Sequence, residues 1–246
     1  MKVVIAIDSF KGCMNSMEAG NAAKAGILKV CDAQISVKPL ADGGEGTTEA
    51  LVEGMGGEYV FVEVTGPLGT KTRARYGILG DGRTAVMEMA EAAGIILLKP
   101  EELSPSRATT YGVGEMIMDA VKRGCREFII GIGGSATSEG GVGMLQALGY
   151  EFKTEDGNPI RRGLQDLDRI MAISKENVPK VLKECHFRVA CDVTNPLCGE
   201  NGAVYVYGPQ KGVKEEEKPI FDGMMAHYAD KTQEYKGVDY RMAEGA

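Results

Sequence analysis

Three short loops of the sequence combine glycine with carboxylate, hydroxyl or lysine side chains. Asp8-Ser9-Phe10-Lys11-Gly12 follows one apolar run and Asp42-Gly43-Gly44-Glu45-Gly46 follows another, while residues 131–141 read GIGGSATSEGG. Glycine lets the backbone approach a ligand closely, and free N–H groups at the start of a helix bind anions. Neighbouring carboxylates are suitable ligands for Mg²⁺, and a lysine ammonium can pair with phosphate. These residue types therefore indicate phosphate and Mg²⁺ chemistry.

The loop 131–141 lies between an apolar strand pattern and a helix pattern. Its successive N–H groups and the positive end of the helix predict an anion cradle. It contains neither the Gly-Lys-Ser/Thr of a P-loop nor a regular G-x-G-x-x-G. A tight turn for close helix–strand packing would need the same glycines and stays open, although Ser135 and Glu139 favour function. The residues expected to bind the nucleotide are Gly133, Gly134, Ser135, Ala136 and, from the first loop, Lys11.

Carboxylates at predicted strand ends and helix starts are the candidate metal ligands and catalytic groups. Mg²⁺ takes one or two protein carboxylates and keeps several waters, so we expect it near Asp42, Glu45 or Asp192. Asp192, ahead of Asp42, is the candidate for orienting an acceptor hydroxyl, as aspartates do in other phosphoryl transfers. Helix capping by Asp42 or Glu45 and an Asx turn at Asp192 are the structural alternatives.

The remaining candidates would contact the transferred phosphate or the substrate. Lys11, directly after the first apolar run, is expected to act as a catalytic ammonium on the phosphate. Arg107, in the cap of a helix after Pro105, could form a bidentate hydrogen-bonded pair with a substrate carboxylate. Asp8 and Ser9 are the other substrate candidates. A solvated surface position is the alternative for Lys11 and for Arg107.

The elements that must position these loops alternate between strand and helix patterns. Apolar runs predict strands over residues 3–7, 35–40, 128–132 and 187–193, and helix patterns follow the first three. Asn15 with Glu18 forms a capping-box signal for the first helix. This alternation favours a parallel sheet with ligands beyond the carboxyl ends of its strands, where the loops above would meet.

Between these units the pattern changes to short alternating runs separated by turns. Residues 59–64, 73–79 and 85–89 predict an antiparallel meander. Residues 203–207 predict another strand, and residues 214–235 an amphipathic helix. The chain is therefore expected to contain more than a single parallel sheet.

The fold class predicted is α/β, with a Rossmann-like parallel-sheet domain, a second mixed α/β domain and an active-site cleft between them. The first domain is placed at residues 1–60 and about 90–145, and the second at residues 61–89 and about 146–246. A chain of 246 residues suits one large or two closely joined domains.

Composition excludes several classes of function. A formal charge of −7 with no tryptophan argues against nucleic acid as a partner. No run of apolar residues is long enough for a membrane helix, and the N-terminus lacks a signal-peptide pattern, so the cytoplasm is the expected location. Six scattered cysteines without C-x-x-C predict neither a disulfide nor zinc, and two histidines disfavour a histidine-based hydrolase.

Read together, the loops resemble those of the bacterial glycerate kinases over essentially the whole chain. The stretches that carry the resemblance are residues 8–12 with 16–19, 39–47, 65–69, 131–149, 191–202 and 207–212. The resemblance implies an ATP-dependent kinase that transfers the γ-phosphate to D-glycerate, with 2-phosphoglycerate favoured over 3-phosphoglycerate. ATP, Mg²⁺ and glycerate are then the ligands, without a membrane or nucleic-acid partner, and a homodimer is left open.

Two departures from the family pattern limit this expectation. Ser138-Glu139 stands where the family usually carries Asn-Asp, which keeps the charge on a longer arm. The family's chains also continue into a glycine-rich segment near Glu244-Gly245-Ala246, so the sequence is expected to lack the family's C-terminal third. A non-catalytic nucleotide- or carboxylate-binding protein is therefore the main alternative, and a dehydrogenase that binds NAD through the glycine loop is the second.

Overall fold

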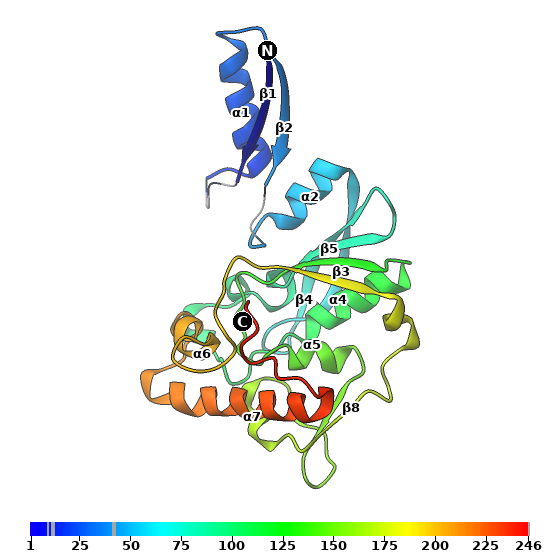
Figure 1. Ribbon diagram of the computed structural model, residues 1–246, viewed down its shortest axis with the longest axis vertical. Helices are drawn as coiled ribbons and strands as arrows, with labels where there is room; N and C mark the ends of the chain where they lie inside the picture. Colours follow the sequence, from blue (N-terminus) through cyan, green and yellow to red (C-terminus); the bar gives the residue numbers. More distant parts are fainter. Residues whose placement is uncertain (9, 11–12, 41–42, 246) are drawn as a thin grey trace.

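The computed structural model describes residues 1–8, 10, 13–40 and 43–245 of the chain. Its centre is a mixed five-stranded sheet in the order β3-β4-β5-β6-β9 (Figure 1). The strands are Gly57–Thr65 (β3), Lys71–Leu79 (β4), Thr84–Glu88 (β5), Glu127–Gly131 (β6) and His186–Ala190 (β9). β3, β4 and β5 are antiparallel neighbours, which confirms the predicted meander, whereas β5, β6 and β9 run parallel.

The register of the parallel strands decides where a ligand can lie. Glu88 pairs with Gly131, and Gly131 pairs with Ala190, so the last residues of β5, β6 and β9 stand side by side. The carboxyl ends of three strands therefore share one edge, and the loops that follow them meet there.

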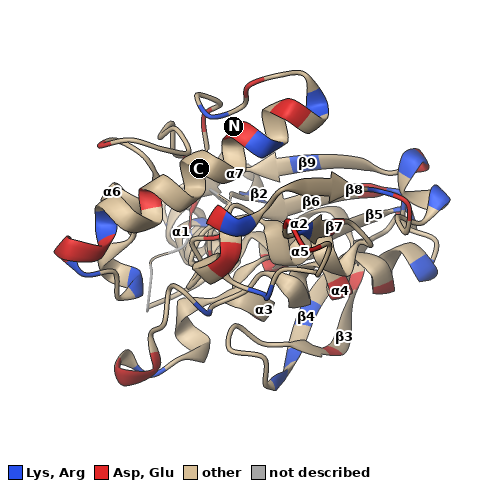
Figure 2. Cartoon of the chain, turned by 90° about the horizontal axis from the view of Figure 1, so that it is seen from below, with Lys and Arg blue, Asp and Glu red and all other residues tan. Residues whose placement is uncertain are grey.

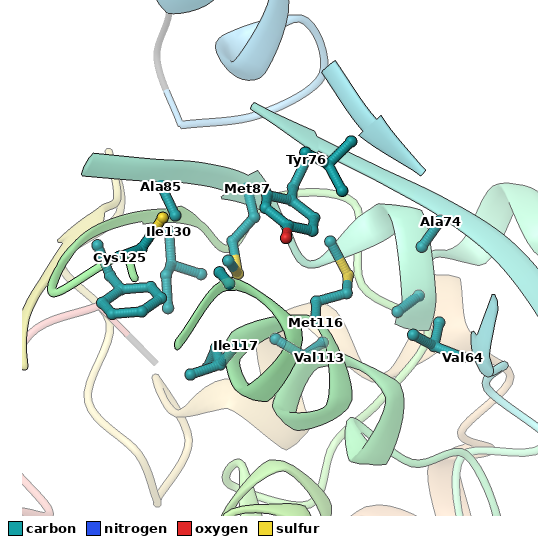
Figure 3. Packing of buried hydrophobic residues seen from close by; sticks show 14 of the residues in the cluster. Val64, Ala74, Tyr76, Ala85, Met87, Val113, Met116, Ile117, Cys125 and Ile130 are labelled. Carbon is teal, nitrogen blue, oxygen red and sulfur yellow. The ribbon is translucent and has the colours of Figure 1, made fainter. Parts of the chain in front are cut away.

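Helices cover both faces of this sheet because its strands bury alternate residues on opposite sides. On one face, α3 (Ala90–Ala93) and α4 (Tyr111–Lys122) pack on the main apolar core, which Figure 3 shows around Tyr76, Met87 and Met116. α2 (Thr47–Met55) covers the other face through Val52. Tyr76 is fully buried and donates a hydrogen bond to the Asp119 carboxylate at 2.7 Å, and burial raises the pKa of its phenol.

A second apolar cluster lies between the remaining elements, with Phe152, Leu164 and Met225 at its centre. The elements are α5 (Val142–Ala147), β7 (Glu151–Lys153), β8 (Ala172–Ser174), α6 (Ala203–Tyr207) and α7 (Lys218–Lys236). Short 3₁₀ turns lie at Ile95–Leu97, Pro100–Glu102, Leu164–Arg169, Lys180–Glu184, Pro209–Lys211 and Glu215–Glu217. Within the described ranges, no helix combines the length and the apolar character needed to cross a membrane.

The strand predicted at residues 203–207 is wrong, because these residues form α6. Their β-branched and aromatic side chains favour a strand in isolation. In the fold, however, Val204 is fully buried in the second cluster, and this packing outweighs the local propensity.

The N-terminal elements form a separate unit at one end of the molecule (Figure 1). β1 (Lys2–Ile7) and β2 (Gln34–Pro39) pair in parallel, and α1 (Ser16–Leu28) connects them. The predicted capping box is confirmed, since Asn15 and Glu18 bond each other's backbone N–H groups. Asn15 also donates to the Glu49 carboxylate at 2.6 Å, which ties this unit to α2.

The α/β class is confirmed. The single parallel sheet predicted for the first domain is divided, because β1 and β2 pair in a sheet of their own, whereas β6 pairs with β5 and β9 in the five-stranded sheet. The predicted domain boundaries stay a prediction. The central sheet joins the meander, placed in the second domain, with β6, placed in the first.

Candidate functional site

Two glycine loops pack against each other at the shared carboxyl edge of the sheet. The N–H of Gly133 donates to the carbonyl of Gly43 at 3.3 Å. A β-carbon on Gly131 would lie 2.4 Å from the Gly43 carbonyl oxygen. Gly43 itself has φ +90°, and a β-carbon there would lie 2.4 Å from the oxygen of Ala190. Glycine is therefore required at both positions, because main chain fills the space where a side chain would begin.

Two cavities open on either side of this packed backbone. The first, of about 310 Å³, includes Arg73 and Arg75 of β4 and is called the arginine cavity. The second, of about 330 Å³, includes Ser135 and Asp192 and is called the glycine cavity. Both are lined by Glu45, Gly133 and Gly134, so these residues form a common wall. Two ligands can therefore approach each other across this wall.

The negative groups of the arginine cavity are largely engaged within the protein. Glu49 accepts a hydrogen bond from Asn15, and Glu91 accepts the N–H of Arg75 at 3.0 Å and lies 3.5 Å from its guanidinium. Arg73 stacks over the Phe61 ring at 4.3 Å and has no carboxylate partner in the described part of the chain. Basic residues appear in blue along β4 in Figure 2. Arg73 is thus the guanidinium best placed to meet an anionic ligand.

Glu88 forms the base of the arginine cavity at the end of β5. Its carboxylate is 5% exposed and accepts the N–H groups of Thr48 at 2.7 Å and Gly46 at 3.3 Å. Burial raises the pKa of this carboxyl, while the two backbone N–H groups oppose that shift. Glu88 therefore holds the N-terminus of α2 against the sheet, a role that the sequence analysis did not assign to it.

Residues of the loop after β6 line the glycine cavity. The N–H groups of Gly134 and Ser135 donate to no backbone carbonyl among the described residues, and Gly134 has φ +72°. Ala136 differs, because its N–H donates to Ala93 at 2.8 Å and its side chain is buried. Of the residues predicted to form the anion cradle, Gly133, Gly134 and Ser135 line this cavity and Ala136 does not, and their role in binding an anion stays a prediction.

Two predicted metal ligands, Glu45 and Asp192, line the glycine cavity together. Both are exposed to it, and Asp192 lies just beyond the end of β9, as predicted. No cluster of three or more metal-binding side chains occurs in the described residues. Mg²⁺ that arrives with a nucleotide needs only one or two protein carboxylates, so this pair fits it.

Lys211 lines the same cavity and had no assigned role in the sequence analysis. Its ammonium donates to the Ser135 hydroxyl at 2.8 Å and to the Thr137 carbonyl at 2.6 Å. Burial lowers the pKa of Lys211 to about 8. Its only signal in the sequence was its place in the stretch 207–212, which contributed to the resemblance.

Glu139, which favoured a functional reading of the loop, has a structural role instead. It is 1% exposed and accepts the Thr110 hydroxyl at 2.6 Å, the Thr110 N–H at 2.8 Å and the Gly143 N–H at 2.9 Å. Burial raises the pKa of this carboxyl. The carboxylate thereby joins the start of α4 to α5 and does not line either cavity.

The other predicted site residues are placed as follows. Arg107 is exposed and lines neither cavity. Asp8 is exposed and lines a small neighbouring space of about 20 Å³ that also touches Glu45. Three predicted residues, Ser9, Lys11 and Asp42, lie outside the described residues.

Comparisons with known proteins agree over the full chain. The model of a family described as the glycerate kinase family matches residues 3–246. The glycerate kinase of Haemophilus influenzae and the glycerate 2-kinase of Escherichia coli are each 44% identical over 247 residues, which is 100% of this chain and 65% of theirs. A crystal structure of a candidate glycerate kinase 2 from Salmonella typhimurium LT2 has a TM-score of 0.94 and 44% identity, covering 100% of this chain and 66% of that one. The chain thus spans about 65% of the length of these curated relatives.

Proposed function

The chain belongs to the glycerate kinase family, and on that premise we propose that it transfers the γ-phosphate of ATP to a hydroxyl of D-glycerate, giving ADP and phosphoglycerate. The observation that carries this proposal is the pair of cavities with one common wall. A transfer between two substrates needs both to be held with the reacting atoms about 3–3.5 Å apart. Because both cavities are lined by Glu45, Gly133 and Gly134 among the described residues, ligands bound in them would lie next to each other.

The chemistry of each cavity supports one substrate. The glycine cavity offers the N–H groups of Gly134 and Ser135, which suit the phosphates of ATP. The arginine cavity offers Arg73, whose guanidinium matches the planar carboxylate of glycerate. In this arrangement Arg73 takes the role that the sequence suggested for Arg107.

In the transfer, the glycerate hydroxyl oxygen bonds to the γ-phosphorus while the bond from that phosphorus to the bridging oxygen of ADP breaks. Asp192 orients the hydroxyl and accepts its proton. Glu45, which lines both cavities, would hold Mg²⁺, and the ion would neutralise phosphate charge when bound. We assign the 2-hydroxyl as acceptor, since the Escherichia coli relative is named a glycerate 2-kinase. A reaction that consumes ATP agrees with the cytoplasm, the location expected from the sequence.

A coupled assay of ADP release with ATP, Mg²⁺ and D-glycerate tests the proposal. Glycerol is the matched control, because it keeps the hydroxyl groups and lacks the carboxylate. We expect ADP release that depends on D-glycerate and is absent with glycerol, and phosphorus NMR of the product then identifies the hydroxyl. ATP binding without glycerate-dependent release would identify a non-catalytic binder, and affinity for NAD in place of ATP would support a dehydrogenase.

A further inference from the structure

Lys211 is buried without a negative partner among the described residues. Lys211 is 8% exposed. Its ammonium donates to two neutral acceptors, the Ser135 hydroxyl and the Thr137 carbonyl. No described carboxylate lies within 4.0 Å of it. Moving an ammonium out of water costs desolvation free energy. Hydrogen bonds to neutral acceptors offset only part of this cost. A second, negatively charged partner would offset this cost.

The surrounding chain fixes the position of this ammonium. Lys211 ends the short turn Pro209–Lys211, and Gly212 follows with φ +97°. The flanking residues Val204 and Val213 are buried in the second apolar cluster. The N–H of Val213 also closes the turn on the carbonyl of Gly208 at 3.0 Å. The lysine is therefore presented by a packed scaffold and not by a loose surface loop.

The ammonium also has one donor left for a ligand. It carries three N–H groups, and the described hydrogen bonds use two of them. Lys211 lines the glycine cavity together with Gly134 and Ser135, whose backbone N–H groups donate to no described backbone carbonyl. A phosphate in this cavity would meet the ammonium and both backbone donors.

We propose that Lys211 binds a phosphate group of the nucleotide in the glycine cavity through a charge-assisted hydrogen bond. Its other two hydrogen bonds hold the loop that supplies the backbone donors, so one residue both shapes the cradle and gives it charge. This inference rests on the proposed function, because it takes ATP as the occupant of the glycine cavity.

The proposal makes ATP affinity depend on pH in a stated direction. A bound phosphate favours the ammonium over the neutral amine, so affinity falls as pH rises above about 8, where free Lys211 loses its proton. The other titratable groups lining the cavity are Glu45, Cys191, Asp192 and Tyr207. Thiols and phenols also ionise at alkaline pH. The Lys211→Arg variant separates the contributions, because a guanidinium keeps its charge throughout this range.

The test is calorimetric titration of the 246-residue chain with ATP and with adenosine, without added metal. At pH 7 we expect Lys211→Met to weaken ATP binding about 10- to 100-fold, the factor for a lost hydrogen bond to a charged group. Adenosine affinity should change less than about twofold, since adenosine carries no phosphate. Lys214→Met, the exposed lysine of the same segment, is the matched control and should bind ATP like the wild type.

Each outcome decides between this inference and the proposed function. Equal ATP affinity of wild type and Lys211→Met overturns the role of Lys211 alone, whereas a wild type that binds no ATP overturns both. Should Lys211→Met fail to fold, the pH series on wild type and Lys211→Arg gives the answer. A fall in ATP affinity above about pH 8 in wild type but not in Lys211→Arg supports the proposal, and parallel profiles contradict it.

Discussion

Arg73 lines a cavity whose other charged side chains mostly form hydrogen bonds within the protein. Glu49 and Glu91 bond to Asn15 and Arg75, and Glu88 holds the start of α2. The guanidinium of Arg73 lies over Phe61, an apolar surface that limits its hydration and orients its plane. At the scale of single residues, this is the feature that favours a carboxylate ligand.

Replacing Arg73 with Met should therefore raise the KM for D-glycerate about 10- to 100-fold, the effect of losing a charge-assisted contact. ATP affinity should stay within about twofold, because Arg73 does not line the glycine cavity. Steady-state kinetics with varied D-glycerate and calorimetry with ATP measure the two effects. Arg107→Met is the matched control. If it raises the KM instead, the carboxylate contact belongs to Arg107.

Asp192→Asn should lower kcat for ADP release by about 10²- to 10⁴-fold, the range typical of a lost general base. Folding should be unaffected, since Asp192 is exposed and its side chain makes no hydrogen bond within the described residues. Thermal unfolding followed by circular dichroism checks this second point. Glu200→Gln, an exposed charge in the same loop, should keep wild-type turnover. Near-normal turnover of Asp192→Asn would remove Asp192 from the reaction.

Residue types and spacing predicted that Glu45, Asp192 and the glycines after β6 would lie together, and they line one cavity because each belongs to a loop that follows a strand. Arg73 and Lys211 could not be identified in the same way. Arg73 reaches the site only because β4 pairs beside β5 and turns that face of the strand toward the cavity. Lys211 is separated from Ser135 by 76 residues, so its burial depends on packing that spacing does not encode.

At the scale of elements, the junction of α4 and α5 is held by buried hydrogen bonds. The Thr110 hydroxyl donates to Glu139 at 2.6 Å and accepts the N–H of Met144 at 2.8 Å. Thr110 is 5% exposed, so water cannot replace these bonds readily. The glycine loop leads from β6 into α5, and Glu139 within it bonds to both helices, so the shape of the loop depends on this junction.

Thr110→Val keeps the side-chain shape and removes both bonds, leaving buried groups of Glu139 and Met144 with fewer partners. We expect the free energy of unfolding to fall by about 1–3 kcal/mol. Urea denaturation measures it, with Thr70→Val as the control, since Thr70 is exposed and should change by less than about 0.5 kcal/mol. A loss no larger than that of the control would show that the junction does not depend on this hydroxyl.

Elements with strong periodicity were predictable, and those set by distant packing were not. The meander, the capping box of α1 and the strands that end at the glycine loops follow from local patterns. α6 did not, because four of the five residues 203–207 are β-branched or aromatic and favour a strand in isolation, whereas the fold buries Val204 in the second cluster. Its position in the glycine loop likewise suggested a site role for Glu139, but its carboxylate accepts three hydrogen bonds within the fold.

At the scale of the whole molecule, α2 connects the parts that form the arginine cavity. Its N-terminus rests on Glu88 at the end of β5, and Glu49 within it bonds Asn15 of the N-terminal unit. Asn15, Glu49 and Glu88 all line the cavity. The position of α2 therefore determines how the N-terminal unit and the sheet face each other across the proposed glycerate site.

The wall between the cavities has a consequence for the evolution and redesign of this chain. The glycines packed beside it, Gly43 and Gly131, admit no β-carbon, so the main chain that supports the proposed reacting centre can hardly change by mutation. The side chains that would select the acceptor lie on one side of it, on β4, and those that would hold phosphate lie on the other. Substitutions on β4 could thus change the preference for the acceptor substrate while the main chain between the two cavities stays the same.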